Sequence, residues 1–212
     1  MNNNGELISH KLKTRTPKND VTKYEFYDEM LMMSSRENKC EIVTSELKRC
    51  GKGIHIYPLA KIVAPEMVEI EDYAKIDDFV FINGGRGVKI GRYVHIAAFA
   101  SIFGGGKCIL EDYVGISEGV RIITGTETHQ EGKRMSAALP LEQRNPLIGE
   151  VHVEKDAFVG ANSVIHPNVI IGKGAIIGSN SLVLNDIEPW SINVGSPCKK
   201  IGVRQKIAVP DI

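Results

Sequence analysis

Residues 153–183 read VEKDAF-VGANSV-IHPNVI-IGKGAI-IGSNSL-V, and a branched aliphatic residue opens every group of six. These residues are Val153, Val159, Ile165, Ile171, Ile177 and Val183. Neither a helix nor an ordinary hairpin sheet has this period. One short strand and one tight turn per six residues predict a parallel β-helix, whose narrow interior the aliphatic side chains fill coil after coil. Glycine at Gly160, Gly172 and Gly178 is expected where the backbone turns with positive φ.

The same repeat runs earlier in the chain with a stride of twenty residues. The aliphatic columns are Ile56, Ile76, Ile96 and Ile116; Ile62, Ile82, Ile102 and Ile122; and Ile70, Ile90 and Leu110. Three groups of six need only eighteen residues, so each early coil carries two extra ones. They fall in the glycine clusters at residues 84–87 and 104–106, which we expect to form bulges that lengthen one corner of the coil.

Composition indicates one compact domain of 212 residues, with 42% hydrophobic residues and 26 basic against 26 acidic side chains. This balance argues against nucleic acid or a membrane as the main partner. Residues 1–20 are polar, and no long apolar run follows, so we expect a cytoplasmic protein. The four cysteines show no CxxC spacing, which leaves both a zinc site and a disulfide framework unsupported.

The sequence before the repeats differs in kind. Aromatic and methionine residues recur at helical spacing from an N-cap at Asp20 or Thr22 as far as Met33, and a second short helix fits residues 45–50. Such helices would cover the open first coil of a β-helix. The expected organisation is a helical cap over residues 1–52, a β-helix over 53–205 with a protruding loop at 124–151, and a tail over 206–212.

Two of the repeats and the closing segment resemble the hexapeptide-repeat acyltransferases, which are left-handed β-helix trimers that use acetyl-CoA. The stretches are Val159-Gly-Ala-Asn-Ser-Val-Ile165, Ile177-Gly-Ser-Asn-Ser-Leu-Val183 and Asn193-Val-Gly-Ser-Pro-Cys-Lys-Lys-Ile201. The twenty-residue coils and residues 90–98 resemble the acetyltransferases of bacterial surface-polysaccharide pathways, such as those of O-antigen in lipopolysaccharide. Some of these acetylate nucleotide-linked amino sugars, including dTDP-4-amino-4,6-dideoxyglucose, and others acetylate sugar hydroxyls.

In this family the loop near residues 124–151 reaches toward a neighbouring subunit and forms the acceptor pocket beside a catalytic histidine. His129 is therefore the candidate base, because imidazole can accept a proton from the attacking group at neutral pH. The sugar-hydroxyl relatives have their histidine where Thr126 stands, so His129 could also bind substrate or be an exposed loop histidine. His95 is the second candidate, with a structural role at a corner as its alternative. An amine acceptor can weaken the need for any base.

The resemblance implies that acetyl-CoA lies along the later coils, between two subunits of a homotrimer. Gly160 and Ala161 match the turn whose amide donates toward the thioester oxygen. Ser179 matches a second pantetheine contact, and Lys199 and Lys200 are placed to meet the CoA phosphates.

The candidate acceptor-binding residues are Asn83, Glu127, Lys133 and Arg134. Glu127 would orient His129 or bind the amino group, and the two cations would meet a diphosphate, for which Arg86 and Arg92 are further candidates.

The expected function is transfer of an acetyl group from acetyl-CoA to the amino group of a nucleotide-linked amino-deoxy sugar. One alternative is a sugar O-acetyltransferase of the galactoside or maltose type. Another is a non-catalytic β-helix, or a carbonic-anhydrase-like one with three histidines around zinc. His95, His129 and His152 lack the spacing of that zinc site, so we expect no metal.

Overall fold

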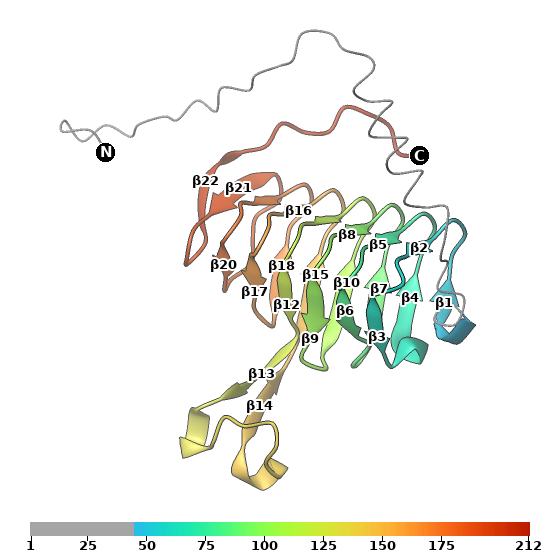
Figure 1. The fold of residues 1–212 in the computed structure, drawn as a ribbon. Coiled ribbons are helices and arrows are strands. Elements are labelled where there is room, and N and C mark those ends of the chain that lie inside the picture. Colours follow the sequence, from blue (N-terminus) through green and yellow to red (C-terminus); the bar gives the residue numbers. More distant parts are fainter. Residues whose placement is uncertain (1–44) are drawn as a thin grey trace, which may run out of the picture. The chain divides into compact units, whose positions relative to one another are not determined.

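The computed structural model describes residues 45–212, which belong to one compact unit. The chain winds through successive coils that add one strand at a time to three parallel sheets (Figure 1). The predicted all-β parallel β-helix is confirmed. Within the described residues, no helix is both long and apolar enough to cross a membrane.

We name the three sheets A, B and C in the order in which the chain visits them. Sheet A contains β1 (Arg49–Cys50), β4 (Val68–Ile70), β7 (Val88–Ile90), β10 (Lys107–Leu110), β15 (Glu150–Val153) and β18 (Val169–Ile171). Sheet B contains β2 (His55–Ile56), β5 (Lys75–Ile76), β8 (His95–Ile96), β11 (Gly115–Ile116), β16 (Phe158–Val159), β19 (Ile176–Ile177), β21 (Ser191–Val194) and β22 (Lys199–Val203). Sheet C contains β3 (Lys61–Val63), β6 (Phe81–Asn83), β9 (Ser101–Phe103), β12 (Arg121–Ile123), β17 (Val164–Ile165) and β20 (Leu182–Val183).

The aliphatic columns fill the interior, as their period predicts. Ile56, Ile76 and Ile96 pair in parallel register from one coil to the next. The six aliphatic residues of the 153–183 stretch are all 0% exposed. Full burial of one such side chain contributes roughly 1.5–3 kcal/mol relative to leaving it in water, so the columns are the main source of stability.

Glycines 160, 172 and 178 serve a different purpose from the predicted one, because none of them has positive φ. A Cβ atom at Gly160 would lie 2.6 Å from the backbone nitrogen of Ser179 in the next coil. Glycine is required here because successive coils approach closely, not because the chain turns. The left-handed residues lie two positions later, at Asn162, Gly174 and Asn180.

The extra residues of the early coils all lie at the corner between sheets C and A. The first coil has the 3-10 turn η1 (Pro65–Met67) there, and the next two have the glycine clusters. A Cβ atom at Gly104 would lie 2.2 Å from the backbone nitrogen of Gly125, so only glycine fits. The prediction that these clusters lengthen one corner is confirmed.

The predicted loop at residues 124–151 is a β-hairpin arm at this same corner. β13 (Gly125–Thr128) and β14 (Asn145–Ile148) pair antiparallel and project away from the β-helix (Figure 1), and the short turns η2 (Gln130–Gly132) and η3 (Leu141–Gln143) lie between them. Thr124 anchors the root of the arm. Its Oγ1 donates to the carbonyl of Phe103 at 2.9 Å and accepts from the N–H of Gly106 at 2.9 Å.

The β-helix begins earlier than predicted. Only Ser45 and Glu46 have helical backbone in the segment 45–50, and the next strand, β1, pairs in parallel with β4. A helix of six residues is marginal in water, whereas pairing with a neighbouring coil satisfies the same backbone groups. The helix expected from Asp20 or Thr22 to Met33 lies outside the described residues.

The last coil and the tail close the other end. Asn193 occupies the interior position of sheet B that isoleucine fills in earlier coils, and its Nδ2 donates to Ser191 Oγ at 2.7 Å. β22 then pairs antiparallel with β21, and the tail runs back over the corner between sheets A and B (Figure 1). Arg204 holds it there by donating to the carbonyls of Asp156 and Gly174.

Candidate active site

The corner between sheets B and C forms a ridge along the β-helix, with one residue from each coil at its crest. Its crest residues, in coil order, are Leu59, Phe79, Phe99, Gly119, Asn162 and Asn180. Backbone hydrogen bonds tie neighbouring turns of this B–C ridge together, such as Asn180 N–H to the carbonyl of Ala161 at 2.8 Å. All but Leu59 have a left-handed backbone. The ridge is therefore a regular row of outward-facing turns.

The predicted CoA-binding residues lie on the later half of this ridge. The N–H of Gly160 already donates to the carbonyl of Ile177 at 2.8 Å, so it is not available to a thioester. The N–H groups of Ala161 and Ser179 have no hydrogen-bond partner among the described residues. Two free donors in successive coils suit the extended amide chain of pantetheine.

Lys199 and Lys200 lie on β22, beyond the end of the ridge. Lys200 is paired with Glu188 through a 2.6 Å contact, and this hydrogen bond lowers the pKa of the Glu188 carboxyl below its usual value. Lys199 is exposed. Of the two lysines, Lys199 is thus the one with its charge uncommitted within the described residues.

His95 lies on sheet B beside the ridge and is held by a carboxylate. Its Nε2 is 2.9 Å from Asp77 Oδ2, and its side chain is 48% exposed. Burial would raise the pKa of Asp77, but the hydrogen bond to His95 and the charges of His95 and Lys75 hold it below its usual value. Asp77 is therefore ionised at neutral pH and accepts a hydrogen bond from Nε2 of His95. In the neutral imidazole with its proton on Nε2, the acceptor nitrogen is Nδ1.

His129 lies on the arm, directly after β13, and is exposed. No hydrogen bond or ion pair of its side chain is found among the described residues. Lys133 is near it in sequence, but its Nζ donates to the carbonyl of Glu142 at 2.6 Å across the arm. The backbone N–H of Arg134 donates to the carbonyl of Gln143 at 3.0 Å. The residue itself is exposed.

Glu127 forms an ion pair with Arg144 between the two sides of the arm. The two side chains are only 15% and 21% exposed, and Glu127 Oε2 and Arg144 Nε are buried with no hydrogen-bond partner among residues 45–212. Breaking a buried pair is destabilising because it leaves a charge uncompensated. Glu127 is thus committed to the arm, and in the described part of the chain no hydrogen bond joins it to His129.

Asn83 also has a local partner. Its Oδ1 accepts a hydrogen bond at 3.0 Å from the N–H of Gly85, which has positive φ. The side chain therefore stabilises the glycine turn at the corner between sheets C and A.

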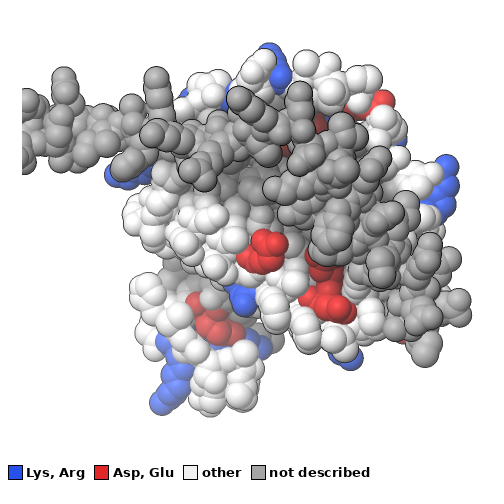
Figure 2. All heavy atoms as spheres, turned by 45° about the horizontal axis from the view of Figure 1, so that its top comes forward, with Lys and Arg blue, Asp and Glu red and all other residues white. Residues whose placement is uncertain are grey.

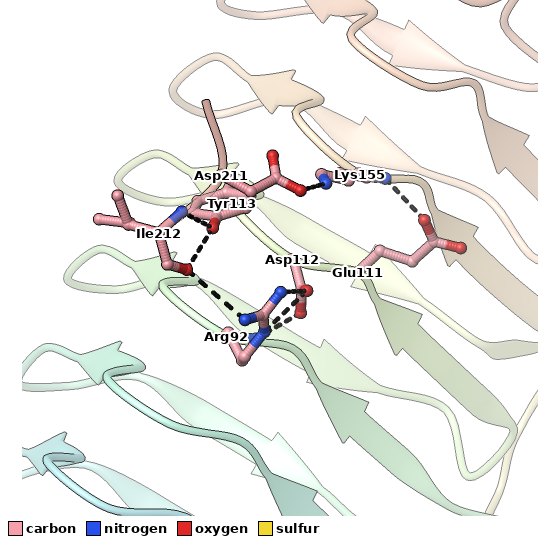
Figure 3. A network of polar contacts seen from close by, with 7 residues as sticks. All are labelled: Arg92, Glu111, Asp112, Tyr113, Lys155, Asp211 and Ile212. Carbon is pink, nitrogen blue, oxygen red and sulfur yellow. Dashed lines mark hydrogen bonds and ion pairs between the residues drawn. The ribbon is translucent and has the colours of Figure 1, made fainter. Parts of the chain in front are cut away.

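The C-terminal tail lies against Arg92, which was one of the cations expected to bind a diphosphate (Figure 3). The Arg92 guanidinium donates two hydrogen bonds to Asp112, at 2.8 and 3.0 Å, and approaches the carbonyl oxygen of Ile212. The Asp112 contacts raise the pKa of Arg92. Tyr113 and Lys155 contact the tail from the same corner, at Ile212 and Asp211. Arg92 is engaged in structure, so it is a poor candidate for a phosphate contact.

Sequence reasoning missed Asp77 and three further residues beside it on the same side of the β-helix: Phe79, Phe99 and Arg121. The repeat period reports which positions face inward, and these side chains all face outward. Figure 2 shows one face on which acidic and basic residues lie as small, separate groups among uncharged ones.

His152 is hydrogen-bonded through Nε2 to Glu111 Oε1 at 2.8 Å, and its side chain is 26% exposed. In residues 45–212 no three His, Cys, Asp or Glu side chains are grouped so that they could hold a metal ion.

Comparison with known proteins places this geometry in a family. Residues 150–185 match the bacterial transferase hexapeptide family (six repeats). An Escherichia coli dTDP-4-amino-4,6-dideoxy-D-glucose acyltransferase is 36% identical over 160 residues, which cover 75% of this chain and 83% of the relative. The chain belongs to the hexapeptide-repeat acyltransferases. The β-helix is accordingly the left-handed one of this family.

Solved structures of these acyltransferases agree. AntD, an N-acyltransferase from Bacillus cereus in complex with dTDP and 3-hydroxybutyryl-CoA, is 31% identical, with a TM-score of 0.75 over 81% of this chain and 90% of AntD. A variant of AntD in complex with dTDP-4-amino-4,6-dideoxyglucose and coenzyme A is 30% identical, with a TM-score of 0.75 over 80% and 91%. A hexapeptide-repeat acetyltransferase from Vibrio cholerae is 15% identical, with a TM-score of 0.54 over 86% and 90%, and shares the fold.

Proposed function

We propose that this acyltransferase moves an acetyl group from acetyl-CoA to the amino group of a dTDP-linked 4-amino-4,6-dideoxy sugar. The observation that carries the proposal is the likeness, over four fifths of the chain, to AntD, whose variant was solved with that amino sugar and coenzyme A. The free amides of the B–C ridge support it, since they suit the CoA donor. The reaction has no step that needs a metal.

For the donor, we propose that pantetheine lies along the later turns of the ridge. The N–H groups of Ala161 and Ser179 would pair with its amide and thioester oxygens. A donor aimed at the thioester oxygen stabilises the negative charge that develops there, and removing one such donor typically costs about 10²–10³ in kcat. Lys199 would meet a CoA phosphate, with Lys200 released from Glu188 as a second contact.

For the chemistry, we propose His95 as the base. The neutral amine attacks the thioester carbon, and a C–N bond forms. Its proton moves to Nδ1 of His95, while Asp77 holds Nε2. The intermediate then breaks the C–S bond, and the CoA thiolate takes the proton from His95. Such a base contributes about 10²–10⁴-fold.

We propose that the arm reaches the acceptor bound to a neighbouring subunit. His129 would then help to bind that acceptor, and Lys133 and Arg134 would lie near the acceptor's diphosphate. This arrangement requires an oligomer, and we propose the homotrimer of the family. We further propose that the protein works in the cytoplasm, in the biosynthesis of a bacterial surface polysaccharide such as O-antigen. Light scattering tests the assembly: a trimer is expected, and a monomer would remove the shared acceptor site.

The substrate class is tested by following CoA release with acetyl-CoA and a panel of dTDP- and UDP-linked amino sugars beside free galactosides and maltose. We expect release only with a dTDP-linked amino sugar. Release only with free sugars would establish O-acetylation instead.

The two histidines are separated by substitution. His95→Ala is expected to lower kcat at least about 100-fold, whereas His129→Ala is expected mainly to raise KM for the acceptor. The reverse pattern would assign the base to His129.

A further inference from the structure

We propose that Phe79 and Phe99 form a stacking platform for the base of the acceptor's nucleoside diphosphate, with Arg121 placed for its phosphates. This inference rests on the proposed function, because it names the part of the protein that recognises the nucleotide. It also concerns the early half of the B–C ridge, whereas the proposed CoA site lies on the later half.

The two rings form an exposed, parallel stack. Their centroids are 5.0 Å apart and their planes differ by 4°. Phe79 is 51% exposed and Phe99 57% exposed, so both rings retain a large area in contact with water. Leu59 and Phe81, also exposed, lie beside them on the same side of the β-helix and extend the apolar surface. Exposed aromatic rings of this kind can stack on any nucleic-acid base, because every base has a flat aromatic face.

Phe79 and Phe99 have a backbone conformation that does not favour a bulky side chain. Both have left-handed φ, 62° for Phe79 and 63° for Phe99. Bulky residues are rare in this region, whereas glycine and asparagine tolerate it. The later turns of the same ridge have Gly119, Asn162 and Asn180 at the equivalent position. Two adjacent coils therefore keep a water-exposed aromatic residue where a glycine or asparagine is more favourable, and the backbone itself does not account for the rings.

The tyrosine ladder at the corner between sheets A and B gives an internal comparison. Tyr73, Tyr93 and Tyr113 stack in the same way and have similar φ. Their ladder, however, is closed at both ends: Lys52 lies over Tyr73 and Lys155 over Tyr113, and the tail bonds to the Tyr113 hydroxyl. Its role within the chain is thus explained by packing. No cation covers the phenylalanine pair among the described residues.

Arg121 supplies the charge that distinguishes a nucleotide from an apolar partner. Its Nη1 donates to the carbonyl oxygen of Phe99 and lies 3.5 Å from Ser101 Oγ, which fixes the guanidinium beside the platform. Its Nε and Nη2 have no partner among the described residues. A guanidinium with two free donors matches a phosphate group. The residue also lies on β12, directly before the root of the arm, so a nucleotide held here lies near the proposed acceptor machinery.

CoA also contains a base and a diphosphate, so the experiment must distinguish CoA from the nucleotide of the acceptor as the ligand of the platform. Binding of dTDP, thymidine and CoA is measured on the full-length protein by calorimetry and NMR titration. Phe99→Asn removes the ring and introduces the residue that this ridge has elsewhere, so the fold is retained. Loss of one base–aromatic stack is expected to weaken both dTDP and thymidine at least about fivefold, with CoA unchanged.

Three matched variants complete the design. Phe99→Tyr retains the stack and is expected to bind as the wild type does. Tyr73→Asn, at the equivalent position of the other ladder, is expected to change nothing. Arg121→Gln is expected to weaken dTDP, not thymidine, and to reduce the salt dependence of dTDP binding.

The platform is contradicted if Phe99→Asn leaves the affinity for dTDP unchanged, if it weakens CoA instead, or if it changes only the oligomeric state measured by light scattering. Its failure is distinguishable from failure of the proposed function. A protein that shows the predicted dTDP binding but acetylates no amino sugar would keep the platform and refute the reaction. Normal acetylation with an unchanged acceptor KM in Phe99→Asn would keep the reaction and refute the platform.

Discussion

At the scale of single residues, position in the coil outweighs intrinsic preference. Twelve residues other than glycine have positive φ in residues 45–212, and they include tyrosines and phenylalanines. Each would be unfavourable alone, by about 1–2 kcal/mol, yet at the corners of the coils hydrogen bonds and packing between neighbouring turns hold this conformation. Position in the coil also explains the glycines at 160, 172 and 178. They are required because successive coils approach closely there, and not because the chain turns.

Cys108 is buried in the interior, and burial, with a smaller effect of the Glu150 charge, raises the pKa of its thiol to about 12. Roughly one thiol in ten thousand is then ionised at pH 8, and the thiolate is the reactive form. We expect iodoacetamide at pH 8 to label the exposed Cys50 and to spare Cys108 until the protein is unfolded. Peptide mass spectrometry checks this, and equal labelling of both in the native protein would show that the interior opens readily.

Asp77→Asn tests the carboxylate that holds His95. The variant should lower kcat at least about tenfold, because the imidazole loses its fixed orientation. The lowered pKa of Asp77 has a second consequence. The ionised carboxylate stabilises the fold above pH 3.8, the ordinary pKa of an aspartate, and this contribution disappears as the pH falls through the lower folded-state pKa.

Chemical denaturation of both proteins between pH 3 and pH 7 measures that contribution. The difference in free energy of unfolding should persist down to about pH 4 and shrink below it. A difference that instead grew below pH 4 would mean that the carboxylate is not held as the ion.

At the scale of strands and turns, Gly172 tests the close approach of coils. A Cβ atom there would lie 2.6 Å from the backbone nitrogen of Pro189. Gly172→Ala should therefore destabilise the protein by about 1–3 kcal/mol, as overpacking of a core does. The matched control is Gly105→Asn, where φ is +76° and nothing lies within 4 Å of the added atom. Thermal unfolding compares the two, and equal melting temperatures would show that the coils can separate at no cost.

The sequence predicts the interior of these elements well and their outer face poorly. An inward position must be aliphatic in every coil, so a column such as Ile56, Ile76 and Ile96 repeats visibly. An outward position has no such requirement, and the contact of Asp77 with His95 depends on how adjacent coils are aligned. The sequence predicts where the arm leaves the β-helix but not that it is a β-hairpin, because β13 and β14 carry no alternating apolar pattern.

The helix expected at residues 45–50 fails for a related reason. Helical spacing is a local signal, and pairing of β1 with the neighbouring coil overrides it.

At the scale of the whole molecule, the B–C ridge organises the proposed reaction. Its early turns have the phenylalanine platform, its later turns have the free amides of Ala161 and Ser179, and His95 lies on the adjoining sheet. One continuous edge would thus align the nucleotide sugar and the CoA arm, which bind to different coils, with their reacting groups between them. Alignment of two reactants in this way is a major source of rate enhancement.

The central claim is N-acetylation of a dTDP-linked amino sugar. The most direct measurement incubates the purified protein with acetyl-CoA and dTDP-4-amino-4,6-dideoxyglucose, and then determines the mass of the product and, by NMR, the atom that carries the new group. We predict a gain of one acetyl group, bonded to the sugar nitrogen, with one CoA released per product. An acetyl group on a hydroxyl oxygen, or an unchanged sugar in the presence of an intact trimer, would contradict the account.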